Sequence, residues 1–435
     1  MLRTAAQWHA FRIPAVWYTD EVARDDVSPQ TVTPLGPDFL WGVATSGFQS
    51  EGHAPDSNWL RRIDESNFEP YGNSIDFYSR YTSDIPLAGA LGVQVFRISV
   101  EWARVQPRPG EWDENALRFY DAVLDTIVAA GMRPMITLDH WVYPGWESDR
   151  GGWNNPGMVD DWLANMRVVV DRYAPRNPLW VTVNEPVAYI VYEMRYTGVD
   201  AQTIEERIAA VHNVSYDYIH QVQPDAMVTC NVGYVSGRET EVNQPMVDRI
   251  SGKLDYFGVD YYFGADDPDE PAPEDRQIWE LPLQAEGVYY ALRHYARLYP
   301  DKPLYVVENG MPTENGQSRP DGYDRADYLR DLVYWLQRAR MDGMNVIGYC
   351  YWSLTDNYEW GFYTPRFGLY TVDVRTDPDL VRKPTDAVDA YRDIVRTGGV
   401  PATYRPTRPP LACSYVDPPS SCTDPVTLPD PSART

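Results

Sequence analysis

Two glutamates stand at the ends of apolar, β-rich runs of the chain. Residues 180–183 predict a buried strand that Pro186 cannot continue, so Glu185 lies at the strand's end. Residues 303–307 form a second run of this kind, and Glu308 follows it. Either glutamate alone is compatible with a solvated strand end. Together they offer the paired carboxyl groups of glycosidic bond cleavage, in which one group protonates the leaving oxygen and the other attacks or activates water.

The elements around these glutamates alternate between strands and helices. Strands are predicted at 39–45, 93–98, 134–138, 180–185, 226–230, 255–262, 303–308 and 346–352. Helices are predicted at 75–91, 115–130, 158–173, 204–221, 285–299, 325–341 and 386–396, with a short helix in the irregular segment before 255–262. Eight β/α units favour an α/β fold of the (β/α)8 TIM barrel class, with the site at the C-terminal ends of the strands. An open doubly wound sheet is the alternative, but no glycine-rich phosphate loop follows the first strand.

The chain is expected to form a single domain with two extensions. Residues 1–36 predict an irregular N-terminal extension, residues 37–396 the catalytic barrel, and residues 397–435 a Pro-rich tail along the surface or in solvent. The 43% hydrophobic content suffices for one large core.

Composition argues against several classes of partner. A formal charge of -25 disfavours nucleic acid and anionic membrane surfaces. The first thirty residues contain no apolar run of signal-peptide length, which favours a soluble cytoplasmic protein, although a disulfide between Cys413 and Cys422 in the tail would favour secretion. Histidines and cysteines show no metal-ligand spacing, so no metal and no cofactor are expected. The sequence does not predict the oligomeric state.

Seven motifs in order carry a specific resemblance. They are Phe39-Leu40-Trp41-Gly42-Val43-Ala44-Thr45 through Gln49 and Glu51-Gly52, Phe96-Arg97-Ile98-Ser99, His140-Trp141, Gly151-Gly152-Trp153, Asn184-Glu185-Pro186, Glu308-Asn309-Gly310, and Tyr351-Trp352-Ser353-Leu354 with Asp356-Asn357-Tyr358-Glu359-Trp360. In these motifs the chain resembles glycoside hydrolase family 1, the β-glucosidase and β-galactosidase family of retaining (β/α)8 barrels. The resemblance covers residues 38 to about 395.

The resemblance implies a role for each matching residue. Glu185 matches the family's acid/base and Glu308 its nucleophile. Arg97 matches the arginine that keeps the nucleophile anionic, Tyr262 the tyrosine that hydrogen-bonds it, and Asn184 the contact to the sugar 2-hydroxyl. The sugar-binding positions of the -1 subsite match Gln49, His140, Trp141, Glu359 and Trp360, with Trp352 as an aromatic floor. For a retaining enzyme, the two catalytic carboxyl groups are expected about 5 to 5.5 Å apart.

The chain also departs from the family pattern. Asp260 stands where asparagine is usual, Val142 where aspartate is more frequent, and the segments after Pro186 and Trp360 are short. Period-two alternation places Asp260 and Tyr262 on the same side of a strand, toward the catalytic carboxyl groups. A third acid there is expected to raise the pKa of its nearest acidic neighbour, Glu185 being the case considered, or to take up a proton itself. The alternative is that an arginine or a backbone amide pairs with Asp260 and nothing is perturbed.

The resemblance therefore implies a retaining, exo-acting β-glycosidase that acts on β-D-glucosides or related small-molecule β-glycosides through a covalent glycosyl-enzyme. Two alternatives stay open, a catalytically silent sugar-binding barrel and an endo-acting barrel glycanase. The short segments leave the aglycone unpredicted, and the sequence does not decide among glucoside, galactoside and fucoside.

Overall fold

The structure, a computed structural model, describes residues 32–265, 276–408 and 410. Most of the expected N-terminal extension, and the Cys413 and Cys422 pair, lie outside these residues. Cys230 and Cys350 are described, and both are free and buried, as their place in predicted strands indicates. Among the described helices, none is both long and apolar enough to cross a membrane.

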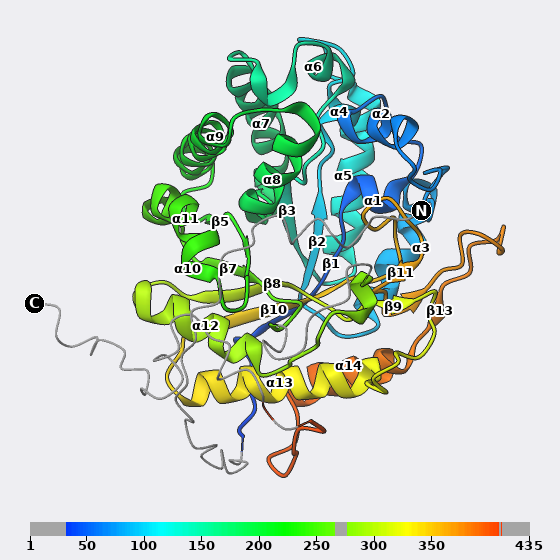
Figure 1. The fold of residues 1–435 in the computed structure, drawn as a ribbon, viewed down its shortest axis with the longest axis vertical. Helices are drawn as coiled ribbons and strands as arrows, with labels where there is room; N and C mark the ends of the chain where they lie inside the picture. The colour runs from blue at the N-terminus through cyan, green and yellow to red at the C-terminus, as the bar shows by residue number, and fades with distance from the viewer. Residues whose placement is uncertain (1–31, 266–275, 409, 411–435) are drawn as a thin grey trace, which may run out of the picture.

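One parallel sheet forms the centre of the molecule (Figure 1). Its strands are β1 (Leu40–Ala44), β2 (Val95–Ser99), β3 (Arg133–Asp139), β4 (Leu179–Val183), β5 (Met227–Thr229), β6 (Val232–Gly233), β7 (Phe257–Asp260), β8 (Leu304–Asn309) and β10 (Val346–Trp352). They pair in the order β5-β4-β3-β2-β1-β10-β8-β7-β6. Because β5 and β6 are separated by two residues alone, they are two pieces of one strand, and the sheet closes into the predicted eight-stranded barrel.

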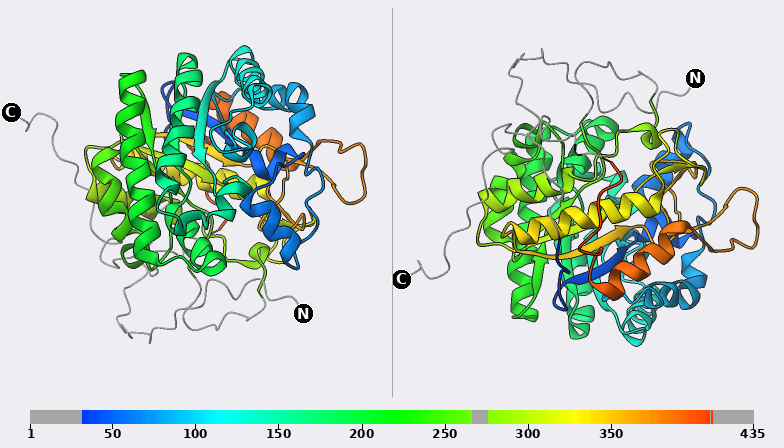
Figure 2. Two further views of the ribbon diagram at one scale, coloured as in Figure 1. Left: turned by 90° about the horizontal axis from the view of Figure 1, so that it is seen from above. Right: turned by 90° about the horizontal axis from the view of Figure 1, so that it is seen from below.

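Helices surround this barrel (Figures 1 and 2). The longer ones are α3 (Phe77–Gly89), α5 (Glu114–Ala129), α7 (Met158–Tyr173), α8 (Pro186–Thr197), α9 (Ala201–Val222), α12 (Gly287–Leu298), α13 (Arg325–Met341) and α14 (Asp386–Thr397). Shorter ones are α1 (Gly47–Glu51), α2 (Asn58–Glu65), α4 (Trp102–Val105), α6 (Gly145–Asp149), α10 (Glu239–Val242) and α11 (Gln244–Ile250). The bounds of α7 and α13 agree with the sequence prediction at both ends. The prediction missed α8, which begins directly after Glu185.

Apolar side chains fill the barrel on both sides of the sheet. A large cluster packs between the strands and the helices, and a smaller one lies inside the barrel. Val95 of β2 belongs to the inner cluster. Strand alternation then places Arg97, two residues on, inside the barrel too, where it is fully buried. A buried guanidinium needs charged or hydrogen-bonding partners, and these lie at the site.

The described parts of both terminal segments pack against α13. Gln337 of this helix donates to the carbonyl of Thr33 at 2.7 Å and accepts from the backbone N–H of Val400 at 2.8 Å. Farther along, the hydroxyl of Tyr404 donates to Asp331 at 2.6 Å. The start of the Pro-rich segment therefore runs along the protein surface, which was one of its two expected courses.

Candidate active site

The two glutamates lie where the C-terminal ends of β4 and β8 meet the barrel rim. Glu185 follows β4 and has a left-handed backbone conformation, with φ 38°, immediately before α8. Its N–H donates to the carbonyl of Asn231 at 3.1 Å, which ties the end of β4 to the break between β5 and β6. Glu308 is the fifth residue of β8 and is buried. The barrel thus brings both predicted carboxyl groups to one end.

Glu308 receives a hydrogen bond at each of its oxygens. The guanidinium of Arg97 donates from Nη1 to Oε1, and the hydroxyl of Tyr262 donates to Oε2 at 2.8 Å. Arg97 also donates from Nη2 to Asn184 Oδ1 at 2.6 Å and from Nε to Thr137 Oγ1 at 2.9 Å. A carboxylate needs hydrogen-bond donors at both oxygens once it is taken out of water, and Arg97 and Tyr262 supply them. Arg97 and Tyr262 therefore hold the carboxyl group of Glu308 in place, and Arg97 sets a positive charge against it.

Glu185 has a contrasting environment. Loss of surrounding water raises the pKa of its carboxyl group to about 8, the negative charge of Glu308 adds to the rise, and Arg97 opposes it. The carboxyl group also lies against Gly233, where an added Cβ would be 2.4 Å from Glu185 Oε1. Glu185 therefore holds a proton at neutral pH beside an ionised partner. A general acid and a nucleophile need this division.

A cluster of polar and aromatic groups lies near the two glutamates. Glu359 accepts from the indole N–H of Trp352 at 2.8 Å and from Gln49 Nε2 at 3.1 Å. The ring of His140 stacks on Trp352, with centroids 5.8 Å apart and planes 12° apart. Burial and then the charge of Arg97 hold the pKa of His140 well below its usual range, so the imidazole is neutral. The structure brings together these four predicted sugar-binding residues.

The two remaining predicted sugar-binding residues, Trp141 and Trp360, differ in burial. Trp141 is buried, and its indole N–H donates to the carbonyl of Asn184 at 2.7 Å. That contact supports the strand end that carries the acid and leaves no indole N–H for a sugar. Trp360 is 40% exposed and meets Trp141 edge-on, with ring centroids 5.2 Å apart. The outward tryptophan is thus the one available to a ligand.

Asp260 is buried at the end of β7, in register with Glu308. Asn231 donates to its Oδ2, and Oδ1 has no hydrogen-bond partner within the described residues. Burial, then the charges of Glu308 and Glu185, raise the pKa of Asp260 well above its usual range. Of the expectations for this residue, the structure favours uptake of a proton by Asp260 itself. Burial is the largest cause of the raised pKa of Glu185, and the charges that add to it are those of Glu308 and Glu359 rather than Asp260.

Sequence reasoning missed Asn231, which links two site residues. Its amide donates to Asn184 Oδ1 at 2.8 Å as well as to Asp260. The predicted fifth strand ended at Cys230, so the rule that active-site residues follow barrel strands would have found it. Within the described part of the chain, no group of three or more His, Cys, Asp or Glu side chains is arranged to hold a metal ion.

The fold and site define a barrel glycosidase with two carboxyl groups in contrasting environments. The family model described as glycosyl hydrolase family 1 matches residues 32–234 and 222–400. The chain belongs to glycosyl hydrolase family 1, and it is an O-glycosyl hydrolase of the retaining β-glycosidase type.

Characterised relatives agree with this assignment. Beta-glucosidase A of Thermotoga maritima is 27% identical over 441 residues, which cover 83% of this chain and 98% of the relative. The 1,4-beta-D-glucan glucohydrolase of Thermotoga neapolitana is 26% identical over the same shares of the two chains. Among solved structures, a beta-glycosidase from Pyrococcus horikoshii matches with a TM-score of 0.73 and 25% identity, covering 85% of this chain and 96% of that one. The Thermotoga maritima beta-glucosidase in complex with deoxynojirimycin matches with a TM-score of 0.74, 25% identity, and coverage of 85% and 100%. No observation favours the silent sugar-binding barrel or the endo-acting glycanase.

Proposed function

We propose that Glu308 is the nucleophile and Glu185 the acid/base of a β-D-glucosidase that releases a terminal glucose, or a closely related sugar, from a small-molecule β-glycoside. The observation that carries the proposal is the contrast between the two carboxyl groups, one held by Arg97 and Tyr262 and the other protonated at neutral pH. The names of the two Thermotoga relatives support the glucose preference.

The reaction then has two displacements. Glu308 attacks the anomeric carbon while Glu185 gives its proton to the leaving oxygen, and a glycosyl ester forms on Glu308. Glu185, now ionised, takes a proton from water, and that water attacks the anomeric carbon and frees Glu308. Asn184 Oδ1 already accepts from Arg97 and Asn231, so its side-chain N–H groups are the ones that donate to the sugar 2-hydroxyl oxygen, a contact that strengthens in the transition state. Gln49, His140 and Glu359 supply acceptors and donors for the other hydroxyls.

Replacing each carboxyl group tests the assignment. Glu308→Ala should abolish hydrolysis of a 4-nitrophenyl β-glucoside, and added azide should restore turnover with an inverted α-azide product. Glu185→Ala should keep turnover of substrates with good leaving groups, because they need no proton, and azide should then give a β-product. Normal activity of both variants on an unactivated glycoside would show that other groups do the chemistry.

A panel of 4-nitrophenyl β-glucoside, β-galactoside and β-fucoside tests the sugar preference separately. The glucoside should have the highest kcat/KM. If another sugar is preferred, the roles of the carboxyl groups stand and the glucose preference is wrong.

A further inference from the structure

Glu359 and Trp360 stand on a tight hairpin turn. Glu359 and Phe362 exchange backbone hydrogen bonds in both directions, each at 2.9 Å. The two residues between them have positive φ, 53° at Trp360 and 96° at Gly361, as a type I′ turn requires. Gly361 cannot be replaced, because an added Cβ would lie 2.5 Å from the Phe68 ring. A tryptophan at positive φ is unfavourable on its own, so contacts elsewhere must hold the turn.

Glu69, far away in sequence, makes three of these contacts. Its N–H donates to the carbonyl of Gly361 at 2.9 Å, and its carbonyl accepts from the hydroxyl of Tyr358 at 2.5 Å. Its side chain accepts from the N–H of Tyr363 at 3.0 Å. These partners flank Glu359 and Trp360 on both sides. The hairpin is thereby attached to the segment after α2.

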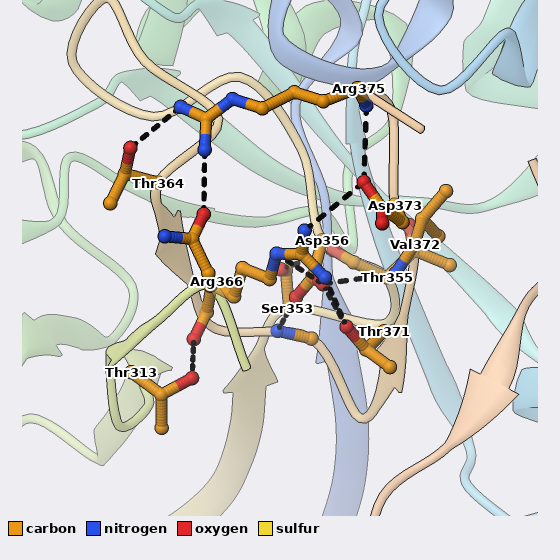
Figure 3. A network of polar contacts seen from close by, with 12 residues as sticks. Thr313, Ser353, Thr355, Asp356, Thr364, Arg366, Thr371, Val372, Asp373 and Arg375 are labelled. Carbon is orange, nitrogen blue, oxygen red and sulfur yellow. Dashed lines mark hydrogen bonds and ion pairs between the residues drawn. The ribbon is translucent and has the colours of Figure 1, made fainter. Parts of the chain in front are cut away.

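Arg375 holds the carboxylate of Glu69 in a two-point pair. Its Nε donates to Oε1 and its Nη2 to Oε2, both at 2.7 Å. The same guanidinium donates at 2.6 Å to the hydroxyl of Thr364, the residue after Tyr363, a contact drawn in Figure 3. Burial raises the pKa of Glu69, but the hydrogen bonds from Arg375 and Tyr363 outweigh it and leave the pKa below its usual range. The pair is therefore charged at neutral pH.

The base of the same loop is fixed independently of this pair. Figure 3 shows Asp356 beside Thr371 and Val372, which follow the hairpin in sequence. Asp356 accepts from the N–H of Gly368 at 2.8 Å, the hydroxyl of Thr371 at 2.6 Å and the N–H of Val372 at 2.9 Å. Because the base is held in this way, loss of the Glu69–Arg375 pair should loosen the hairpin tip and leave the fold intact.

We propose that Glu69 and Arg375 are positioning residues of the sugar subsite, which act by locking the hairpin that presents Glu359 and Trp360. The inference builds on the proposed function, because Glu359 is taken there as a sugar ligand. Glu359 keeps its contacts with Trp352 and Gln49 when the hairpin keeps its place. A small displacement of a group that positions the substrate can lower kcat/KM by a large factor.

The test compares Glu69→Gln, Arg375→Gln and the double variant in steady-state kinetics with a 4-nitrophenyl β-glucoside. We expect KM to rise about tenfold in each, with kcat within about threefold, because ground-state and transition-state binding weaken together. The double variant should be no worse than Arg375→Gln, which removes the pair together with the contacts of Arg375 to Thr364 and Asn315. Arg172→Gln is the matched control: Arg172 has a similar exposure, 27% against 34% for Arg375, and pairs with Glu114 and Asp121 away from the hairpin. Its KM should not change.

Stability measurements separate positioning from a plain structural role. The pair is partly exposed, so its loss should change the thermal midpoint no more than the control variant does. An unchanged KM in Glu69→Gln would overturn the positioning role and leave the proposed function standing, as would an equal rise of KM in Arg172→Gln. If the unaltered protein hydrolyses no β-glycoside, the proposed function fails and the positioning role fails with it.

Discussion

The proton that Glu185 holds should measurably lower the free energy of unfolding at neutral pH. A glutamate has a pKa near 4.5 in the unfolded chain, whereas Glu185 has a pKa of about 8 in the folded protein. Between pH 4.5 and about 8, folding must therefore add a proton to this carboxyl group. Glutamine has nearly the same shape and no proton to take up. We expect Glu185→Gln to be more stable than the natural protein at neutral pH while it loses activity toward unactivated glycosides.

The magnitude follows from proton linkage. Between pH 4.5 and about 8 the folded protein binds one proton more than the unfolded chain at this site. Stability from this group therefore falls by about 1.4 kcal/mol for each pH unit in that window and is constant above it. At pH 7 the linkage amounts to roughly 3 kcal/mol, and because Glu185 retains some solvent contact we expect about 2 kcal/mol. At pH 4.5 the two proteins should differ little.

Urea unfolding at several pH values between 4.5 and 9 measures this difference. The free energy of unfolding of Glu185→Gln minus that of the natural protein should rise with pH and level off near the pKa of Glu185. Glu65→Gln is the control, since Glu65 is exposed on α2 and has no buried charge to relieve. A difference that is the same at pH 4.5 and pH 8 would refute the assignment of the proton to Glu185.

Three further substitutions test the site. Arg97→Met removes the donor to Glu308 and to Asn184, so kcat/KM for a 4-nitrophenyl glucoside should fall by at least about 10³-fold. A loss below tenfold would contradict the role of Arg97. Gly233→Ala places a Cβ 2.4 Å from Glu185 Oε1 and should displace this carboxyl group. Activity should then fall about 10²-fold on substrates with poor leaving groups and much less on activated substrates. An equal loss on both kinds of substrate would argue against displacement of Glu185. Asp260→Asn should leave the basic limb of the kcat/KM profile in place, because Asp260 already carries a proton, whereas a downward shift of that limb would show that Asp260 is ionised.

The sequence by itself predicted most of the elements, and it singled out the two carboxyl groups that we propose as catalytic. The bounds of α7 and α13 follow from amphipathic periodicity, which is a local property of the chain. The ends of β4 and β8 follow from apolar β-rich runs that stop at chain-breaking residues. Because parallel barrel strands all end at the same rim, Glu185 after β4 and Glu308 near the end of β8 lie at one end of the barrel. The expected spacing of about 5 to 5.5 Å between their carboxyl groups stays a prediction.

Tertiary structure decided which groups surround each carboxyl group. Arg97 meets Glu308 across 211 residues of sequence, and Glu69 meets Arg375 across 306. The break between β5 and β6, which brings Asn231 to both Asn184 and Asp260, has no local signal of comparable strength. Helix and strand preferences act over a few residues, whereas the pKa of a buried acid depends on water, charges and donors supplied by distant segments. For this reason the sequence could name Glu185, Glu308 and Asp260, and the folded chain had to determine that Arg97 and Tyr262 donate to Glu308 while burial and neighbouring charges raise the pKa of the other two.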